Sequence, residues 1–243
     1  MAIYITGDIH GDPSRFLELK YFCKEHENVE WIICLGDVGL NYYGIDHPRE
    51  MYLKNMASKI PANLFCIHGN HERRPSGDDG YEMIQLNSGS IRGYAWWNPE
   101  YPNQYFAVDG TAYTIYTSSG EKTVCVCGGA YSVDKFYRLE HGWSWWPDEQ
   151  PNSIVKQNVE SIVECSIPDI MLTHTCPTRF VPTELFLDGI DQSTVDNSTE
   201  EFLDKIYEMF PADKKPMWYF GHFHGNKYTN SYVMLYEDII ELK

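Results

Sequence analysis

The sequence has no long hydrophobic run, because none of its apolar stretches approaches the roughly 20 residues that a membrane-spanning helix needs. Residues 1–6 also lack the positively charged start of a secretory signal peptide, and a motif of polar residues follows them directly. We therefore expect a protein with no signal peptide and no membrane partner.

Positive charge is scarce. Nineteen lysines and arginines stand against 35 aspartates and glutamates, which gives a formal net charge of −16. Proteins that bind the nucleic-acid backbone usually carry a basic stripe, and this sequence has none. Non-specific binding of nucleic acids is therefore not expected.

A disulfide framework is also absent. The seven cysteines are odd in number and scattered, and most lie inside apolar runs, as Cys34 and Cys66 do. Packed, reduced thiols of this kind are typical of a cytoplasmic protein, and we predict that location. Cys125 and Cys127 share one face of a predicted strand, but no second cysteine pair accompanies them, so we do not expect them to bind a metal.

The 243 residues are enough for one large domain, and a hydrophobic content of 43% excludes a disordered chain. In the first 67 residues, predicted strands and helices alternate, which implies right-handed crossovers and a partly parallel sheet. The predicted strands cover 2–6, 31–35 and 62–67, and the predicted helices cover 13–27 and 48–59.

Residues 82–128 differ, because short apolar runs alternate there with turn residues and predict antiparallel strands in a second sheet packed on the first. An aromatic-rich inserted segment follows at about 130–152. Beyond it we expect helices at 153–165 and 199–209, strands at 169–172 and 217–220, and a closing hairpin at 228–242. The predicted fold class is mixed α/β (α+β), with a single domain over residues 1–243.

Five short polar motifs each follow an apolar run. The central one contains Asp37 and comes directly after the predicted strand 31–35. The others contain Asp8 and His10, Asn70 and His71, His174, and His222 and His224. Because open sheets bind ligands outside the carboxyl ends of their strands, we expect these side chains to meet.

These motifs offer carboxylate oxygens, an amide oxygen and imidazole nitrogens, which hard or borderline divalent cations prefer. The i, i+2 spacing in 8–10 and 222–224 directs both polar side chains of each extended segment the same way. Seven ligands exceed the needs of one ion but suit two ions that share a carboxylate. The candidate metal ligands are Asp8, His10, Asp37, Asn70, His174, His222 and His224.

The order of these motifs over residues 7–224 resembles that of the calcineurin-like metallophosphoesterases. The resemblance implies a two-sheet β-sandwich flanked by helices, in four αββα layers. It also implies one metal held by Asp8, His10, Asp37 and His224, and a second held by Asp37, Asn70, His174 and His222. Asp37 would then bridge the two ions, and His71 would approach the leaving-group oxygen.

The implied activity is that of a metal-dependent phosphoesterase, in which a hydroxide bridging two divalent metals attacks a phosphate mono- or diester. Asp37 and His71 are then the candidate catalytic residues. Oxygen and imidazole ligands without thiolate leave manganese, iron, zinc, nickel and cobalt possible, and we expect manganese first. The expected partner is the phosphate-ester substrate, and the sequence leaves the oligomeric state open.

The chain departs from the Ser/Thr protein phosphatases of this superfamily, which continue Gly-Asp with a further Asp-Arg-Gly. Residues 40–42 are Leu-Asn-Tyr, so the carboxylate that would orient His71 and the arginine that would bind phosphate are absent. Because guanidinium groups suit phosphate, Arg73 and Arg179 are candidate substrate-binding residues. Glu72 and Arg74 are further candidate substitutes for the missing pair.

Two alternative functions stay open. One is a Ser/Thr-type protein phosphatase, which the residues at 40–42 disfavour. The other is a non-catalytic scaffold protein on the same fold, which the complete set of candidate ligands disfavours.

Several residues outside the motifs allow two interpretations. Trp143, Trp145 and Trp146 could form a wall of a substrate cleft or a small core under a loop. His68 precedes Gly69 on the predicted strand and is expected in the core. The roles of Asp134 and Arg138 stay open.

Overall fold

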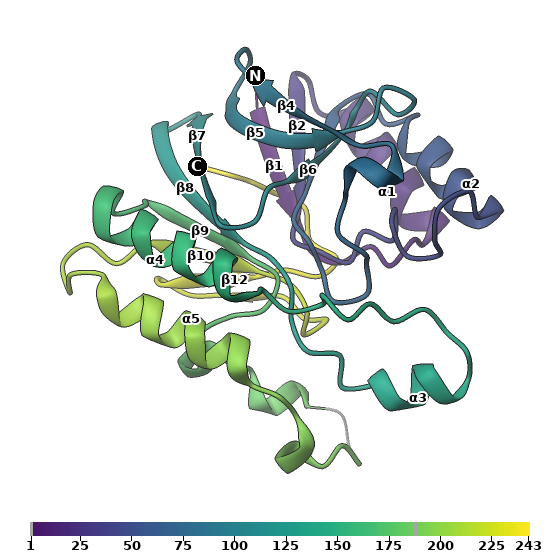
Figure 1. The fold of residues 1–243 in the computed structure, drawn as a ribbon. Helices are drawn as coiled ribbons and strands as arrows, with labels where there is room; N and C mark the ends of the chain where they lie inside the picture. The colour runs from purple at the N-terminus through teal and green to yellow at the C-terminus, as the bar shows by residue number, and fades with distance from the viewer. Residues whose placement is uncertain (1, 187–188) are drawn as a thin grey trace.

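In the computed structural model, which describes residues 2–186 and 189–243, two groups of parallel strands carry the fold (Figure 1). The first group contains β1 (Ala2–Thr6), β2 (Val29–Cys34), β3 (Asn63–Cys66) and β6 (Gln104–Ala107). The second contains β8 (Gly120–Cys127), β9 (Ile170–Thr173), β10 (Met217–Phe220) and β12 (Tyr232–Met234).

Antiparallel strands join the two groups into one curled sheet. β5 (Ile91–Trp97) pairs with β6 on one side and with β7 (Thr111–Thr117) on the other, and β7 pairs with β8. β4 (Glu82–Leu86) pairs with β5 alone. The structure confirms the mixed α/β class. It does not confirm the two-sheet sandwich, because β5 takes part in both halves.

The C-terminal segment differs from the predicted hairpin at 228–242. β11 (Lys227–Tyr228) pairs with β12 as a hairpin would, but β12 also extends the second parallel group beside β10. The chain then crosses to the opposite edge of the sheet, where β13 (Ile240–Glu241) pairs with β1. The hairpin prediction is wrong for this last part because it treated two short strands as neighbours from their sequence order alone.

The four predicted helices are present, with ends within two residues of the prediction. They are α1 (Pro13–Glu25), α2 (Pro48–Ala57), α4 (Ser153–Ser166) and α5 (Ser198–Met209). The start of α1 follows from its sequence, because Asp12 accepts a hydrogen bond from the Ser14 amide and Pro13 takes the first helical position.

The inserted segment holds a helix that the sequence did not predict, α3 (Lys135–Glu140). It is short, and the side chain of Asp134 before it makes no capping hydrogen bond, so the usual start signal is missing. Four 3₁₀ turns complete the described elements: Gly77–Asp79, Thr178–Phe180, Thr183–Leu185 and Gln192–Thr194.

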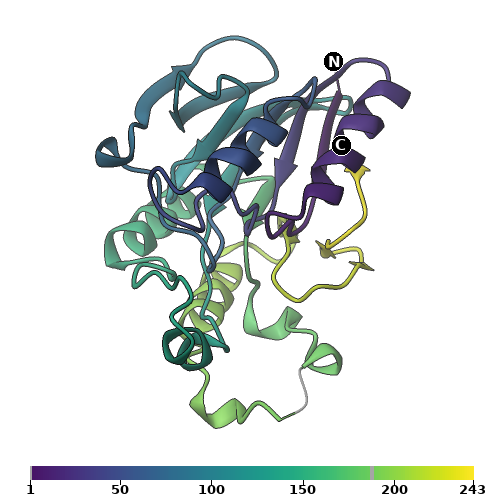
Figure 2. The same ribbon diagram turned by 90° about the vertical axis from the view of Figure 1, so that its right-hand side faces the viewer.

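Side chains alternate between an inner core and two outer ones. Along β2, Ile33 lies in the core enclosed by the curled sheet, whereas Ile32 packs under α1 and α2 (Figure 2). Along β9, Leu172 lies in the inner core, whereas Met171 packs under α4 and α5. Because both faces are covered, residues 31–34 of β2 and 170–172 of β9 form uninterrupted apolar runs.

In this arrangement the carboxyl ends of the parallel strands in both halves lie at the same edge of the sheet. The loops that follow β1, β2, β3, β9 and β10 contain the five polar motifs. Among the described residues, no helix is long and apolar enough to cross a membrane. All seven cysteines are unpaired, five of them buried, and the cytoplasmic location stays a prediction.

A cavity created in the inner core should destabilise the protein. Leu172 is fully buried on β9, so we expect Leu172→Ala to lower the free energy of unfolding by about 2–5 kcal/mol. Leu17→Ala on α1 is the matched control, because Leu17 is 44% exposed and should change stability by about 0.5 kcal/mol or less. Urea denaturation measures both. Equal shifts in the two variants would contradict the layer assignment.

Candidate metal centre

All seven candidate ligands lie at the carboxyl ends of the parallel strands. Asp8 and His10 follow β1, and Asp37 follows β2. Asn70 follows β3, His174 follows β9, and His222 and His224 follow β10. The sequence therefore predicted where these residues lie; which ions they hold stays a prediction.

The backbone is strained at several of these residues. Seven non-glycine residues in the described chain have positive φ, and four of them are His10, Asp37, His222 and His224. Non-glycine residues rarely adopt this left-handed region, and such conformations gather at functional sites where the surroundings impose them. The loop conformations are therefore set by the site rather than by local preference.

Two glycines allow loops to approach the aspartates closely. A Cβ atom on Gly69 would lie 2.0 Å from Asp37 Oδ1, and a Cβ atom on Gly221 would lie 2.2 Å from Asp8 Oδ1. No side chain fits at these distances, so glycine is required here by contact rather than by its φ angle.

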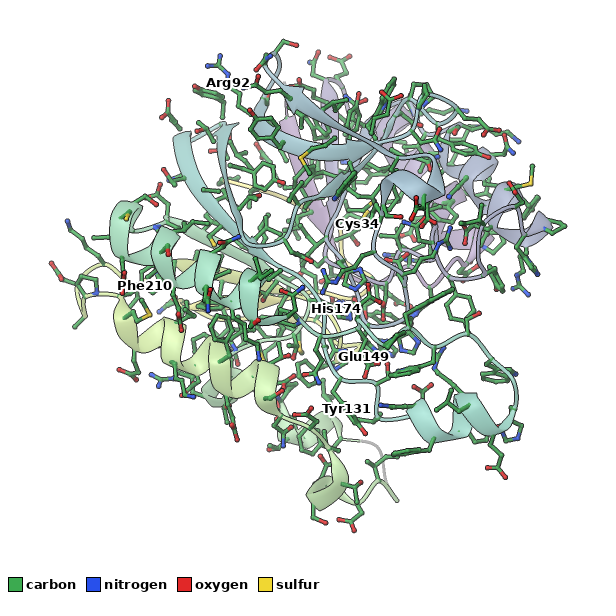
Figure 3. The ribbon with its side chains drawn as sticks, viewed as in Figure 1. Cys34, Arg92, Tyr131, Glu149, His174 and Phe210 are labelled. Atoms are coloured by element: carbon green, nitrogen blue, oxygen red, sulfur yellow. The ribbon has the colours of Figure 1, made fainter. Side chains whose placement is uncertain are left out.

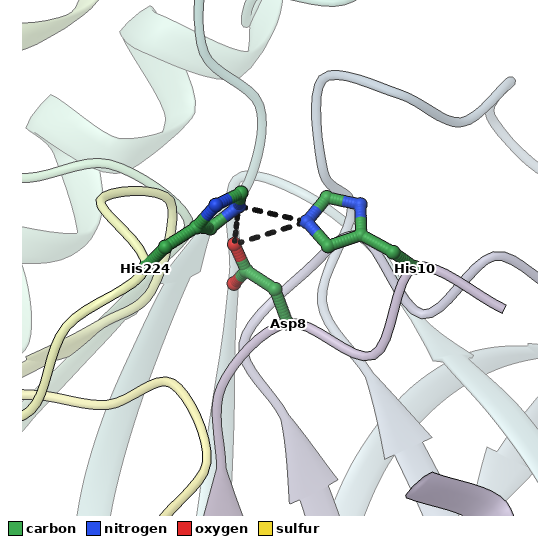
Figure 4. A group of neighbouring side chains, drawn as sticks. All are labelled: Asp8, His10 and His224. Atoms are coloured by element: carbon green, nitrogen blue, oxygen red, sulfur yellow. Dashed lines mark hydrogen bonds and ion pairs between the residues drawn. The ribbon is translucent and has the colours of Figure 1, made fainter. Parts of the chain in front are cut away.

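One group of candidate ligands surrounds Asp8 (Figure 4). Asp8 Oδ2 lies 3.7 Å from His10 Nε2 and 3.3 Å from His224 Nε2. The two imidazole nitrogens face each other at 2.8 Å. The three side chains come from opposite halves of the sheet and direct their metal-binding atoms at one point.

A second group centres on the Asn70 amide oxygen. Asn70 Oδ1 lies 2.8 Å from His174 Nε2 and 3.1 Å from His222 Nδ1. His174 Nε2 also lies 3.4 Å from Asp37 Oδ2. Two oxygens and two nitrogens, all able to bind a cation, therefore converge.

Neighbouring groups orient this second set. Asn70 donates through Nδ2 to Ser132 Oγ at 2.8 Å, which turns Oδ1 toward the histidines. His174 Nδ1 is 2.7 Å from the Leu35 carbonyl oxygen and donates to it, so Nε2 is the nitrogen left for a ligand. If Nε2 carried neither a proton nor a cation, two hydrogen-bond acceptors, His174 Nε2 and Asn70 Oδ1, would face each other at 2.8 Å. The donor set therefore fits a divalent cation.

The charges of the two buried aspartates shape the local pKa values. Burial opposes ionisation of Asp37, but the charges of His71 and His174 hold its pKa well below the usual range. Burial likewise opposes the imidazolium of His174, whereas the charges of Asp37 and Asp8 raise its pKa to about 9. Positive charge, from a proton on an imidazole or from a metal ion, therefore stabilises the buried carboxylates of this centre.

Asp8 belongs to both three-residue groups whose ligand atoms lie within 4.8 Å of one another. These groups are Asp8 with His10 and His224, and Asp8 with Asp37 and His174. In the structure Asp8 thus links the two sets, while the bridging role of Asp37 stays a prediction.

A cleft of about 580 Å³ opens beside the centre, and its lining includes His10, Asp37, Asn70, His71, His222 and His224. An adjoining cavity of about 200 Å³ shares His10, Asp37, His71 and Arg138 with it. The candidate ligands are therefore reachable by a small molecule.

His71 lies in this cleft beside Asp37. Its backbone N–H donates to Asp37 Oδ1 at 2.9 Å, and its Nε2 lies 3.8 Å from Asp37 Oδ2. Its Nδ1 is buried without a hydrogen-bond partner among the described residues. Glu72 does not orient it, because the Glu72 carboxylate accepts from the Gly39 and Leu40 amides at 2.6 and 3.0 Å.

The structure does not support Arg73 as a substrate-binding residue. Its guanidinium donates to both oxygens of Glu50 at 2.9 and 2.7 Å and to Asp79 at 2.9 Å. The Asn41 carbonyl accepts a further bond at 3.1 Å. These partners, on α2, in the turn Gly77–Asp79 and in the loop after Asp37, hold the buried guanidinium outside the cleft lining.

Arg179 is likewise not supported as a substrate-binding residue. It pairs with Asp204 at 2.7 Å and with Glu208, both on the outer helix α5. Its guanidinium also lies over the Tyr207 ring. Arg179 does not appear among the described residues that line the cleft. Arg74 is also committed elsewhere, to Asp109 and the Asp148 carbonyl.

Sequence reasoning left open the residues that the insertion contributes to the cleft. Tyr131, Val133, Asp134 and Arg138 line it. Their signal was weak, because no metal-binding motif or regular helix pattern surrounds them.

The tryptophans of the insertion do not line the cleft. Trp145 Nε1 donates to Glu149 at 2.8 Å, and Trp146 lies beneath the Arg73 guanidinium. Trp143 is exposed. The structure therefore does not place these tryptophans in a cleft wall; Trp145 and Trp146 are half-buried, and a small core around them stays a prediction. His68 is buried, as predicted.

Comparisons with known proteins agree with this geometry. A sequence model of the family described as calcineurin-like phosphoesterase matches residues 1–226. Among solved structures, the protein TT1561 of Thermus thermophilus is similar, with a TM-score of 0.52 and 12% identity over 97% of this chain and 89% of that one. At this identity the likeness shows the fold alone. None of the curated proteins compared with the chain matches it.

The contacts of Arg73 and Arg179 predict that replacing each arginine by alanine lowers the free energy of unfolding by a different amount. Arg73→Ala leaves the buried Glu50 carboxylate without its main partner, and should lower the free energy of unfolding by about 3–5 kcal/mol. Arg179→Ala breaks a more exposed pair and should cost about 1 kcal/mol or less. Thermal and urea unfolding compare the variants. Equal stability would show that Arg73 is not the structural clamp described here.

Proposed function

This chain belongs to the calcineurin-like phosphoesterase family, and on that basis we propose that it hydrolyses phosphate mono- or diesters of small organic groups. The observation that carries the proposal is the convergence of two buried aspartates, an amide oxygen and four imidazoles beside an open cleft. A site that had lost its catalytic activity, as in a scaffold protein, would not be expected to keep every one of these groups.

Within the proposal, one cation is held by Asp8, His10, Asp37 and His224, and the other by Asp37, Asn70, His174 and His222. When bound, two divalent cations supply Lewis acidity, which lowers the pKa of water and offsets negative charge on phosphoryl oxygens. Manganese is the first candidate, and iron, zinc, nickel and cobalt suit the same ligands.

The chain's own residues prepare the site for this chemistry. The depressed pKa values of Asp8 and Asp37 keep both carboxylates ionised at neutral pH. Ser132 and the Leu35 carbonyl fix the orientations of Asn70 and His174, so little reorganisation is needed on binding.

His71 is the proposed acid for the leaving group. It faces the cleft from the loop that follows β3, next to Asp37 and His10. From there it donates a hydrogen bond or a proton to the departing oxygen, a role that contributes typically about 10²–10⁴-fold.

The cleft also has apolar lining residues, which favour a small substrate with an apolar part. Val133, Val181, Leu185 and Phe223 line it, and about 580 Å³ suits a small molecule rather than a folded partner. Aryl esters such as p-nitrophenyl phosphate and bis(p-nitrophenyl) phosphate are therefore suitable first substrates, and their comparison separates monoesterase from diesterase activity.

Asp37→Asn tests the proposed reaction. Loss of the carboxylate charge should remove bound metal and lower manganese-dependent hydrolysis of either ester by at least about 100-fold, since even a supporting partner of a metal ligand costs about 10–100-fold. Metal content and turnover are measured on the same samples. Asp204→Asn, at the surface on α5, is the control and should retain both. Unchanged turnover in Asp37→Asn would refute the mechanism.

His71→Gln separates proton transfer from metal binding. We expect metal content to stay at the wild-type value and kcat to fall by about 10²–10⁴-fold for an ester with a poor leaving group. The loss should be smaller for p-nitrophenyl esters, because their leaving group needs less protonation. An equal loss on both substrates would argue against the acid role.

A further inference from the structure

The cleft contains very little positive charge of its own. Among the described residues that line it and the adjoining cavity, Arg138 is the only arginine or lysine. The chain as a whole carries a formal net charge of −16. A phosphate ester that enters this cleft therefore meets one guanidinium.

Arg138 lies where the two cavities meet. It shares the lining of both with three residues of the candidate centre, His10, Asp37 and His71. The guanidinium is therefore close to the place where the reacting phosphorus must lie.

The Arg138 side chain is held in place from two directions. Its Nε donates to Asp134 Oδ2 at 2.7 Å, and its Nη1 donates to the Tyr42 hydroxyl at 2.9 Å and the Ser144 carbonyl at 3.3 Å. The guanidinium also lies over the Tyr42 ring, 5.5 Å from its centre. The side chain is only 10% exposed.

These contacts leave some N–H donors of the Arg138 guanidinium free to bind a ligand. No described residue accepts a hydrogen bond from Nη2, whereas Nε and Nη1 are engaged by Asp134 and Tyr42. A guanidinium that is already immobilised loses little conformational entropy when it binds an anion. Its free donors suit the oxygens of a phosphoryl group.

We propose that Arg138 binds the non-bridging oxygens of the substrate's phosphoryl group and holds that group against the candidate metal centre. The inference rests on the proposed phosphoesterase function and adds the residue that grips the phosphate. Arg73 and Arg179, the arginines that the sequence favoured for this role, are committed to Glu50 and Asp204 instead.

Tyr42 connects this arginine to the rest of the site. It lies in the loop that follows Asp37, while Arg138 lies on α3 of the inserted segment. The hydrogen bond between them fixes the insertion against the loop that presents Asp37. Arg138 is therefore placed by the fold rather than by local sequence.

Arg138→Met tests the proposal, because methionine keeps an apolar stem and removes the charge and the donors. On metal-loaded protein, we expect the KM for p-nitrophenyl phosphate and the dissociation constant of inorganic phosphate each to rise about 10–100-fold. Bound metal should not change, since Arg138 is not a candidate ligand. Arg138→Lys keeps the positive charge but not the planar guanidinium with its paired donors. Its KM and phosphate dissociation constant should therefore lie between those of Arg138→Met and the wild type.

Arg92→Met is the matched control. Arg92 lies on β5 at the upper edge of the molecule, far from His174 (Figure 3), and its guanidinium lies over the Tyr116 ring. This variant should keep the wild-type KM and phosphate affinity.

The outcomes separate this inference from the proposed function. If the wild type shows no metal-dependent hydrolysis, the proposed function fails, while calorimetry with inorganic phosphate still tests Arg138. If the wild type hydrolyses esters and Arg138→Met keeps its KM and phosphate affinity, the inference is overturned and the function stands. Should the methionine variant unfold, Arg138→Lys decides, and wild-type phosphate affinity in that variant would overturn the inference.

Discussion

Two ionised aspartates, Asp8 and Asp37, are buried close together in this protein, and the rest of the site follows from that constraint. Burial and mutual repulsion both oppose their charges, yet the pKa values of both carboxyls are held low. Backbone amides offset part of the cost, because His222 donates to Asp8 and His71 donates to Asp37. Imidazoles provide the rest when no metal is bound, as the raised pKa of His174 indicates.

The same constraint accounts for the shape of the loops. Close approach of the backbone to each carboxylate needs glycine at positions 69 and 221. Asp37, His10 and His224 have left-handed backbone conformations, which non-glycine residues adopt rarely and which the surrounding structure must maintain. A site with this much unfavourable charge and strain is difficult to explain by folding stability alone, and it suits a function that uses cations.

Much of this site could be predicted because its residues carry a strong local signal. A polar residue directly after an apolar run marks a strand end, and parallel strands bring such ends together, so Asp37 and His174 could be placed without coordinates. Local signals failed where long-range contacts decide. Arg73 follows the His71 motif and looked suited to phosphate, but Glu50, 23 residues earlier in the chain, binds its guanidinium with two hydrogen bonds. The chain after β12 crosses to β1, which no periodicity indicates.

The inserted segment shows the opposite case, in which a weak sequence signal hides a residue at the cleft. Arg138 lies on a helix of six residues without a capping hydrogen bond, and only its contacts with Asp134 and Tyr42 bring it beside the centre. The hydrogen bond between Tyr42 and Arg138 thus joins the loop after Asp37 to the insertion, so that the Asp37 carboxylate and the Arg138 guanidinium both line the cleft.

A crystal structure of the protein grown with manganese, with anomalous diffraction data, tests the central claim most directly. The account predicts two anomalous peaks, one within binding distance of Asp8, His10 and His224, the other within binding distance of Asn70, His174 and His222, with a carboxylate between them. A structure at saturating manganese with no ion at these residues, or with ions only at surface carboxylates, would contradict it.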